Sequence, residues 1–198
     1  MFLKRLYEPL ERAIDESILE VPTDIQKEVI PQIKSGRDVV CFDEEDGNGK
    51  TTALVIATIH KLKEEYADVP RAMILVPDEE KGKEMEELFA TYGDYTSLRV
   101  HTAYPTRKLD DQRDKIYFGT DILIGTVSQI NTQYSMSGIN LGNLQMLIID
   151  DADLIIKDAS VGQMNRIFEC VPKCQKIMFT KKVTDNIQRL IDNEFNVF

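Results

Sequence analysis

The sequence predicts an α/β domain with an open, mainly parallel β-sheet and helices on both faces. Short apolar runs lie at 38–42, 72–76, 97–100, 121–125, 146–149 and 176–179. Several are almost wholly apolar, as is typical of parallel strands that are covered on both sides. Amphipathic helical patterns separate them, for example at 51–65, 79–92, 160–171 and 184–193. This alternation of strands and helices indicates crossover connections and a parallel sheet.

The helix expected over 184–193 has a clear start, because Thr184 and Asp185 are good N-cap residues. In a sheet of this kind, ligands bind beyond the carboxyl ends of the strands. The residues that directly follow each apolar run are therefore the first candidates for a functional site.

Length and composition suit a single domain over residues 1–198. There is no internal repeat and no stretch of linker composition. The first residues lack the pattern of a signal peptide, and no apolar run is long enough to span a membrane. The three cysteines, Cys41, Cys170 and Cys174, suit a reducing compartment and are interpreted as small apolar residues. We therefore expect a soluble, cytoplasmic protein without a membrane partner.

The formal net charge is −10, from 24 basic and 34 acidic residues. Affinity for a nucleic-acid backbone comes mainly from Lys and Arg side chains that neutralise phosphates. No basic stripe is obvious along the chain. The charge balance therefore argues mildly against strong nucleic-acid affinity.

The segment after the first apolar run, residues 44–51, reads EEDGNGKT and precedes a helical pattern. Gly47 and Gly49 allow the backbone, Asn48 included, to curl around phosphates with its N–H groups pointing inward. Lys50 would reach the β and γ phosphates, and Thr51 would hold Mg²⁺. The alternative is a turn that contains Gly and Lys for structural reasons alone. The strand before the loop and the helix after it favour a phosphate-binding loop.

The strand at 146–149 ends in a second set of candidate residues, Asp150, Asp151 and Asp153. Carboxylates at this place suit a Mg²⁺ ligand and a group that positions the attacking water. The alternative is an acidic helix start, which stabilises a helix N-terminus for structural reasons. Together with the glycine-rich loop, the acids favour nucleotide binding.

Over nearly its whole length the chain resembles the first RecA-like domain of the DEAD-box RNA helicases. Residues 22–26, PTDIQ, resemble the Q motif of that family, with Phe2 upstream, in a Q-motif region of about 1–36. The resemblance continues through 36–40 (GRDVV), 75–77 (LVP), 125–126 (GT), 150–153 (DDAD) and 177–180 (IMFT). It implies that Gln26 reads the adenine edge, whose donor and acceptor an amide matches. It also implies ATP or ADP and Mg²⁺ as ligands, and a second RecA-like domain in a complete helicase.

Several family motifs are altered in this sequence. The P-T-R-E-L-A motif, which carries RNA-backbone contacts in the family, reads PDEEKG over 77–82. Residues 126–129 read TVSQ in place of T-P-G-R, and the glycine pair expected near Ala103 and Tyr104 is absent. Motif III reads TKK over 180–182 in place of S-A-T, which puts the coupling of hydrolysis to strand separation in doubt.

The altered motifs leave two hypotheses. In the first, the chain is the ATP-binding domain of an RNA helicase. Lys50, Asp150 and Asp151 are then its catalytic residues, Thr51 and Asp150 hold the metal, and RNA binding by this domain alone is weak. Asp151 stands where the family has Glu and reaches one methylene less. In the second, the chain is a helicase-derived module that binds nucleotide weakly or not at all and acts through protein contacts. An unrelated P-loop enzyme fits the motif order less well.

Overall fold

The structure is a computed structural model that describes residues 6–17, 21–45, 47–136, 139–157 and 159–197. Its strands form one sheet in the order β1-β6-β5-β2-β4-β3, and every neighbouring pair is parallel. The strands are β1 (Val39–Phe42), β2 (Ala72–Leu75), β3 (Val100–Ala103), β4 (Ile122–Gly125), β5 (Met146–Ile149) and β6 (Gln175–Thr180). The predicted open parallel sheet is confirmed.

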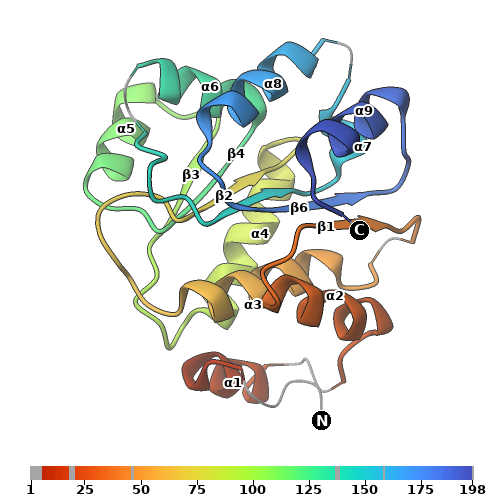
Figure 1. Ribbon diagram of the computed structural model, residues 1–198. Helices are drawn as coiled ribbons and strands as arrows, with labels where there is room; N and C mark the ends of the chain where they lie inside the picture. The colour runs from red at the N-terminus through yellow and green to blue at the C-terminus, as the bar shows by residue number, and fades with distance from the viewer. Residues whose placement is uncertain (1–5, 18–20, 46, 137–138, 158, 198) are drawn as a thin grey trace.

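Helices cover both faces of the sheet (Figure 1). Helices α1 (Glu8–Asp15), α2 (Asp24–Lys34), α3 (Lys50–Leu62) and α4 (Glu79–Tyr92) share one apolar core with the sheet. The second core is shared by α5 (Leu109–Tyr117), α6 (Val127–Ser135), α7 (Ala152–Ile155), α8 (Val161–Cys170) and α9 (Asp185–Glu194). None of the helices in the described part of the chain has the length and apolar character that a membrane span requires.

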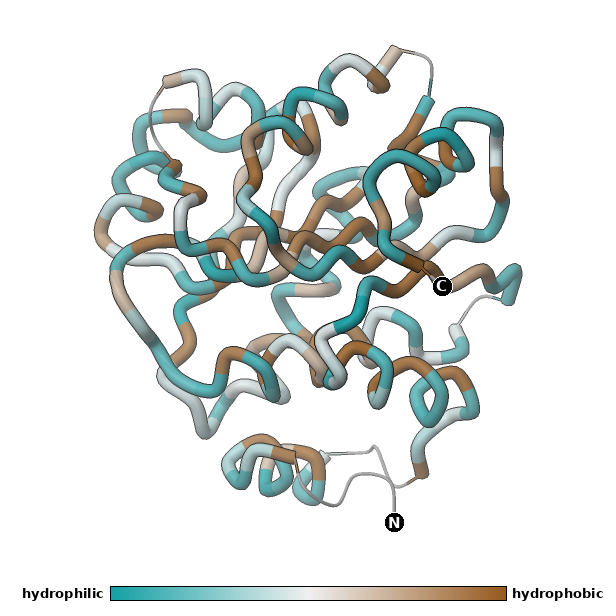
Figure 2. Tube along the Cα trace, in the orientation of Figure 1, coloured by the Kyte–Doolittle hydropathy of each residue, from teal (hydrophilic) through white to brown (hydrophobic). Residues whose placement is uncertain are grey.

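Strand β2 shows why the central strands are apolar throughout. Ala72 and Ile74 belong to the core on the α1–α4 side, while Met73 and Leu75 belong to the opposite core. Successive side chains of a strand point to opposite faces, so a strand covered on both sides needs apolar residues at every position. In Figure 2 the strands at the centre of the molecule are accordingly coloured as hydrophobic.

The largest differences from the predicted bounds are in β3, which overlaps the predicted run at 97–100 only at Val100, and at the end of α3. Strand β3 begins at Val100, and not at Ser97. The backbone N–H and the guanidinium of Arg99 both bind the carboxylate of Asp121, at 3.1 and 2.9 Å. The Arg99 N–H therefore makes no bond to β4, its carbonyl oxygen accepts from Ile122 N–H at 3.1 Å, and the first paired residues are Val100 and Ile122. Helix α3 ends at Leu62, three residues before the predicted end, because Lys63 has a positive φ of 64°.

A buried ion-pair network lies at the amino edge of the sheet, where the strands begin. Asp121, fully buried, accepts hydrogen bonds from Arg71 Nη2 at 2.7 Å and from Arg99 Nε at 2.9 Å. The backbone N–H of Tyr66 adds a third at 3.0 Å. Burial alone would raise the pKa of Asp121, but the hydrogen bonds from Arg99, Tyr66 and Arg71 outweigh it and lower that pKa.

Candidate nucleotide site

Three segments that carry candidate residues meet at the carboxyl edge of the sheet. The phosphate loop follows β1, the acidic residues follow β5, and the start of α4 follows β2. Strand β5 lies next to β2, and only β6 separates it from β1. The parallel topology therefore brings together residues that lie up to about a hundred positions apart in the sequence.

The phosphate loop has the backbone that its glycines predict. Gly47 and Gly49 have φ values of 70° and 89°, a region that other residues adopt only with strain. A Cβ atom at Gly49 would also clash with Nε2 of Gln26, so the buried Gln26 side chain would have to move. Helix α3 begins at Lys50, directly after the loop, and directs its N-terminal end toward it.

Lys50 is the first residue of α3, and its side chain, only 11% exposed, reaches back to the loop. Its ammonium group donates hydrogen bonds to the backbone carbonyl oxygens of Asp43, at 3.0 Å, and Glu45. The ammonium also lies 3.9 Å from the Asp43 carboxylate. Lys50 is therefore at the centre of the loop, where the sequence predicts its contact with phosphate.

Asp43 is a loop residue that the sequence analysis did not single out. Its carboxylate accepts hydrogen bonds from the side-chain amide of Asn48 and, at 2.9 Å, from the backbone N–H of Glu45. The side-chain oxygen of Asn48 is buried and accepts no hydrogen bond from any residue that the structure describes. Glu44 and Glu45 are exposed, so solvent screens their charges. Asp46 lies outside the described residues.

Thr51 and Asp150 meet, as the hypothesis of a metal site requires. The Thr51 hydroxyl donates to Oδ2 of Asp150 at 3.2 Å. Asp150 is 2% exposed, and burial raises its pKa to about 6. The positive charge of Lys81 lowers this pKa in part, while the negative charge of Asp151 raises it further. A buried carboxylate beside a hydroxyl oxygen is a donor set of the kind that Mg²⁺ takes. The residues present therefore fit the expected ion.

Asp151 lies beside Asp150 at the end of β5. Its backbone is left-handed, with φ 55° and ψ 52°, and its side chain is 18% exposed. A non-glycine residue in this region is uncommon and marks a position that the surrounding structure imposes. The strained backbone sets the direction of the carboxylate to which the sequence assigns water positioning.

Lys81 is the second site residue that the sequence analysis missed. Its ammonium lies 3.9 Å from Asp150 Oδ2, 4.0 Å from Asp151 Oδ2 and 3.0 Å from Glu84. Burial would lower the pKa of Lys81, but the carboxylates of Asp150, Glu84 and Asp151 outweigh it and raise that pKa. The sequence feature that could have identified Lys81 is its place in the first turn of α4, which begins just after β2.

Gln26 is buried at the base of the loop. Its side-chain oxygen accepts from the Thr23 backbone N–H at 3.1 Å in a capping box, and its Nε2 donates to the Gly49 carbonyl at 3.2 Å. Both ends of the amide thus bind the protein in this structure and join α2 to the loop. The role in reading adenine stays a prediction. Phe2, the upstream part of the same motif, lies outside the described residues.

The altered motif III keeps a contact with the acidic segment. The Thr180 hydroxyl and the Lys181 backbone N–H donate to Asp153 Oδ1 at 3.2 and 3.0 Å. The end of β6 is therefore joined directly to α7, which follows the two site aspartates. This contact was not expected from the sequence, where TKK was interpreted only as a loss of the S-A-T motif.

The two acidic replacements in the P-T-R-E-L-A motif have structural partners. Asp78 is the N-cap of α4 and accepts from the Lys81 backbone N–H at 2.9 Å. Glu79 accepts from the Thr106 hydroxyl and pairs with Lys83 at 3.0 Å. Carboxylates now occupy positions where the resemblance implies contacts to an RNA backbone, and they repel phosphate.

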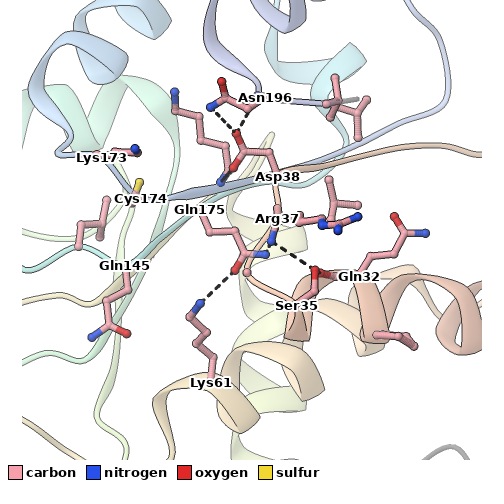
Figure 3. Close-up of a pocket in the computed structure, with 17 residues that line it drawn as sticks. Gln32, Ser35, Arg37, Asp38, Lys61, Gln145, Lys173, Cys174, Gln175 and Asn196 are labelled. Atoms are coloured by element: carbon pink, nitrogen blue, oxygen red, sulfur yellow. Dashed lines mark hydrogen bonds between the residues drawn. The ribbon is translucent and has the colours of Figure 1, made fainter.

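A cavity of about 1330 Å³ lies at the opposite, amino edge of the sheet (Figure 3). Gln175 crosses it: its Nε2 donates to the carbonyl oxygens of Ile33 and Arg37 at 2.9 and 2.6 Å, and its Oε1 accepts from Lys61 at 3.4 Å. These contacts join β6 to α2 and α3. The described residues that line the cavity include none of the predicted site residues, so its size does not make it the nucleotide site.

Comparison with known proteins identifies the family to which the chain is similar. The family model of the DEAD/DEAH box helicases matches residues 23–190. ATP-dependent RNA helicase drs1 of Schizosaccharomyces pombe is 27% identical over 195 residues, which are 96% of this chain and 26% of drs1. ATP-dependent RNA helicase DeaD of Mycobacterium tuberculosis is 29% identical over 181 residues, 90% of this chain and 32% of DeaD. The chain thus spans about a quarter to a third of these relatives.

The fold has close counterparts among solved structures. A DEAD box protein from Methanococcus jannaschii superimposes with a TM-score of 0.88 at 24% identity, over 97% of this chain and 52% of that protein. The dbp5 protein of Saccharomyces cerevisiae, in a complex that contains ADP, gives a TM-score of 0.85 at 18% identity, over 96% and 50% of the two chains. With the family model covering most of its length, this chain belongs to the DEAD/DEAH box helicase family.

Proposed function

We propose that the chain is the ATP-binding, RecA-like domain of a DEAD-box ATP-dependent RNA helicase. The observation that carries the proposal is the 3.2 Å contact between Thr51 and Asp150, which joins the phosphate loop to the acidic segment across the sheet. Lys50 at the centre of the loop adds the cation that would bind the transferred phosphate. The alternative of a module without a working nucleotide site is not favoured by this arrangement.

Each residue has a role that follows from its chemistry and place. Lys50 and the N-terminal end of α3 bind the phosphates, and Gln26 selects adenine. Thr51 and Asp150 hold Mg²⁺, which when bound neutralises charge on the phosphates. Asp151 orients the attacking water, and its shorter reach relative to Glu predicts slow hydrolysis, since a displacement of about 1 Å costs roughly 10²-fold in rate.

RNA remodelling requires more than this chain. We propose that a second RecA-like domain closes on ATP and RNA together with this one, and that this domain alone binds RNA weakly. Asp78 and Glu79 support the weak affinity, because they place carboxylates at positions that resemble RNA contacts. A sub-micromolar, salt-sensitive affinity of the isolated domain for single-stranded RNA would contradict this part of the proposal.

The first test is a titration with fluorescent ADP and ATP in the presence of Mg²⁺. Changing Lys50 to Ala is expected to weaken binding at least about tenfold, because it removes a charge-assisted contact worth roughly 1.5–3 kcal/mol. The matched control is Lys83→Ala, which removes an equal charge from a side chain that is 57% exposed and pairs with Glu79. Equal affinity of the wild type and the Lys50→Ala variant would remove the phosphate-loop assignment.

A further inference from the structure

Lys81 joins three carboxylates at the place where the metal ion is expected. The backbone N–H of Lys81 is fixed by the Asp78 cap at 2.9 Å, so the residue starts the first turn of α4 in a defined position. From there the side chain reaches the end of β5, with its ammonium 3.9 Å from Asp150 and 4.0 Å from Asp151. The Lys81 side chain is 22% exposed, and solvent screens it only in part.

Another lysine on the same helix provides a contrast. Lys83 is 57% exposed and pairs with Glu79 four residues earlier, as a solvated helix lysine does. Lys81 has a similar partner in Glu84, at 3.0 Å, yet it also lies close to the two aspartates that end β5. An ordinary surface ion pair therefore accounts for Lys83 but not for the position of Lys81.

We propose that the Lys81 ammonium is a tethered cation that competes with a divalent metal ion for the carboxylates of Asp150 and Asp151. The inference rests on the proposed function, since it concerns the metal that accompanies the nucleotide. It predicts that the domain binds ADP with a weaker dependence on Mg²⁺ than a variant with an uncharged residue at position 81.

The physical reason is charge. Two adjacent carboxylates attract a divalent cation because their negative charges are close together. A positive group about 4 Å away neutralises part of that charge, and it also repels a second cation that approaches the same oxygens. Since Asp150 is 2% exposed, water screens these interactions incompletely. Lys81 therefore stabilises the acids without a metal and weakens their affinity for one.

The decisive experiment uses Mn²⁺ alone as the probe, with free Mn²⁺ measured by electron paramagnetic resonance and no nucleotide present. Lys81→Met is expected to bind Mn²⁺ about tenfold more tightly than the wild type. Lys83→Met, the matched control, is expected to keep the wild-type affinity. Lys81→Arg keeps the charge and is expected to behave like the wild type, and adding Asp150→Asn to Lys81→Met is expected to abolish the gain.

Any failure of Lys81→Met to gain affinity, including an absence of binding by both proteins, would overturn the inference. A gain that persists after Asp150→Asn would overturn it as well, because the metal would then be held elsewhere. Thermal melting checks that each variant is folded. If Lys81→Met does not fold, Lys81→Gln removes the same charge, keeps a polar end and decides the question in the same assay.

A second titration measures ADP affinity with Mg²⁺ and with EDTA. The ratio of the two affinities is expected to be about tenfold larger for Lys81→Met than for the wild type, and an equal ratio would contradict the inference. If ADP binds to none of the proteins, the proposed nucleotide site is wrong. The Mn²⁺ titration still decides the role of Lys81 in that case, so the two failures are distinguishable.

Discussion

Two buried aspartates lie at opposite edges of the same sheet, and their surroundings differ. Asp121, at the amino edge, receives hydrogen bonds from two arginines and two backbone N–H groups, and its pKa is lowered. Asp150, at the carboxyl edge, has the Thr51 hydroxyl at 3.2 Å and the Lys81 ammonium only at 3.9 Å, and its pKa is raised to about 6. Hydrogen bonds and ion pairs offset the cost of burying the negative charge of Asp121, while Asp150 has too few such partners to offset its own.

This difference separates the amino edge, where the buried carboxylate is paired, from the carboxyl edge, which carries the candidate nucleotide site. At the amino edge, buried charge is paired within the chain, which stabilises the fold. At the carboxyl edge, the structure holds a desolvated carboxylate, a left-handed Asp151 and two glycines with positive φ. Local features that are unfavourable for folding concentrate at sites that bind a ligand. The contrast is the one that the proposed role of Asp150 as a metal ligand predicts.

The largest expected effect is at the amino edge. Changing Asp121 to Asn is expected to lower the free energy of unfolding by about 3–5 kcal/mol, because it leaves buried arginine charge without its partner. Urea unfolding at pH 7 measures the loss. The control is Asp68→Asn, since Asp68 pairs with Arg99 at 2.9 Å but is 73% exposed, and a loss within about 1 kcal/mol is expected. Similar losses in both variants would remove the special role of Asp121.

The difference in stability between the wild type and the Asp121→Asn variant is expected to depend on pH. The pKa of Asp121 is lower in the folded than in the unfolded state, so its stabilisation is present above about pH 4 and is lost as the pH falls further. The difference in stability between the wild type and Asp121→Asn is therefore expected to shrink below about pH 4. A difference that stays constant down to pH 3 would contradict the assignment of a paired, ionised Asp121.

At the carboxyl edge the expected change has the opposite sign. Changing Asp150 to Asn is expected to raise the free energy of unfolding by about 1–3 kcal/mol at pH 7.5 in EDTA, because it removes a poorly compensated buried charge. Urea unfolding without divalent ions measures the gain. A clear loss of stability would show that Lys81 and Thr51 compensate Asp150 as fully as the arginines compensate Asp121, and the comparison between the edges would fail.

The smallest expected effect concerns the contact between β6 and α7. Thr180→Val removes the hydroxyl that lies 3.2 Å from Asp153 Oδ1 and 2.8 Å from the Lys182 carbonyl oxygen, and is expected to lower the free energy of unfolding by about 1 kcal/mol. Thr91→Val is the control, because the Thr91 hydroxyl bonds only the exposed Glu87 carbonyl within its own helix among the described contacts, and almost no change is expected. Equal stability of the Thr180→Val variant and the wild type would make this contact incidental.

The sequence by itself determined the fold class and the backbone of the glycine-rich loop. The alternation of apolar runs and helical patterns predicted the parallel sheet, because strands buried on both faces need apolar residues at every position. The backbone of the loop was predictable because Gly47 and Gly49 lie within one short segment and allow positive φ values. The start of β3 was predicted wrongly, since the long-range bond between Arg99 and Asp121 decides where pairing with β4 begins.

Only the tertiary structure decided which distant residues meet. Lys81 reaches Asp150 and Asp151 because β2 and β5 are neighbours, and Thr180 reaches Asp153 because β6 lies beside β5. Asp43 turns toward Asn48 because the loop curls back on itself. Sequence spacing gives the element on which a residue lies. The order of strands and the direction of each side chain depend on packing across the whole sheet, so the sequence alone does not show that Lys81 meets Asp150 and Asp151 or that Thr180 meets Asp153.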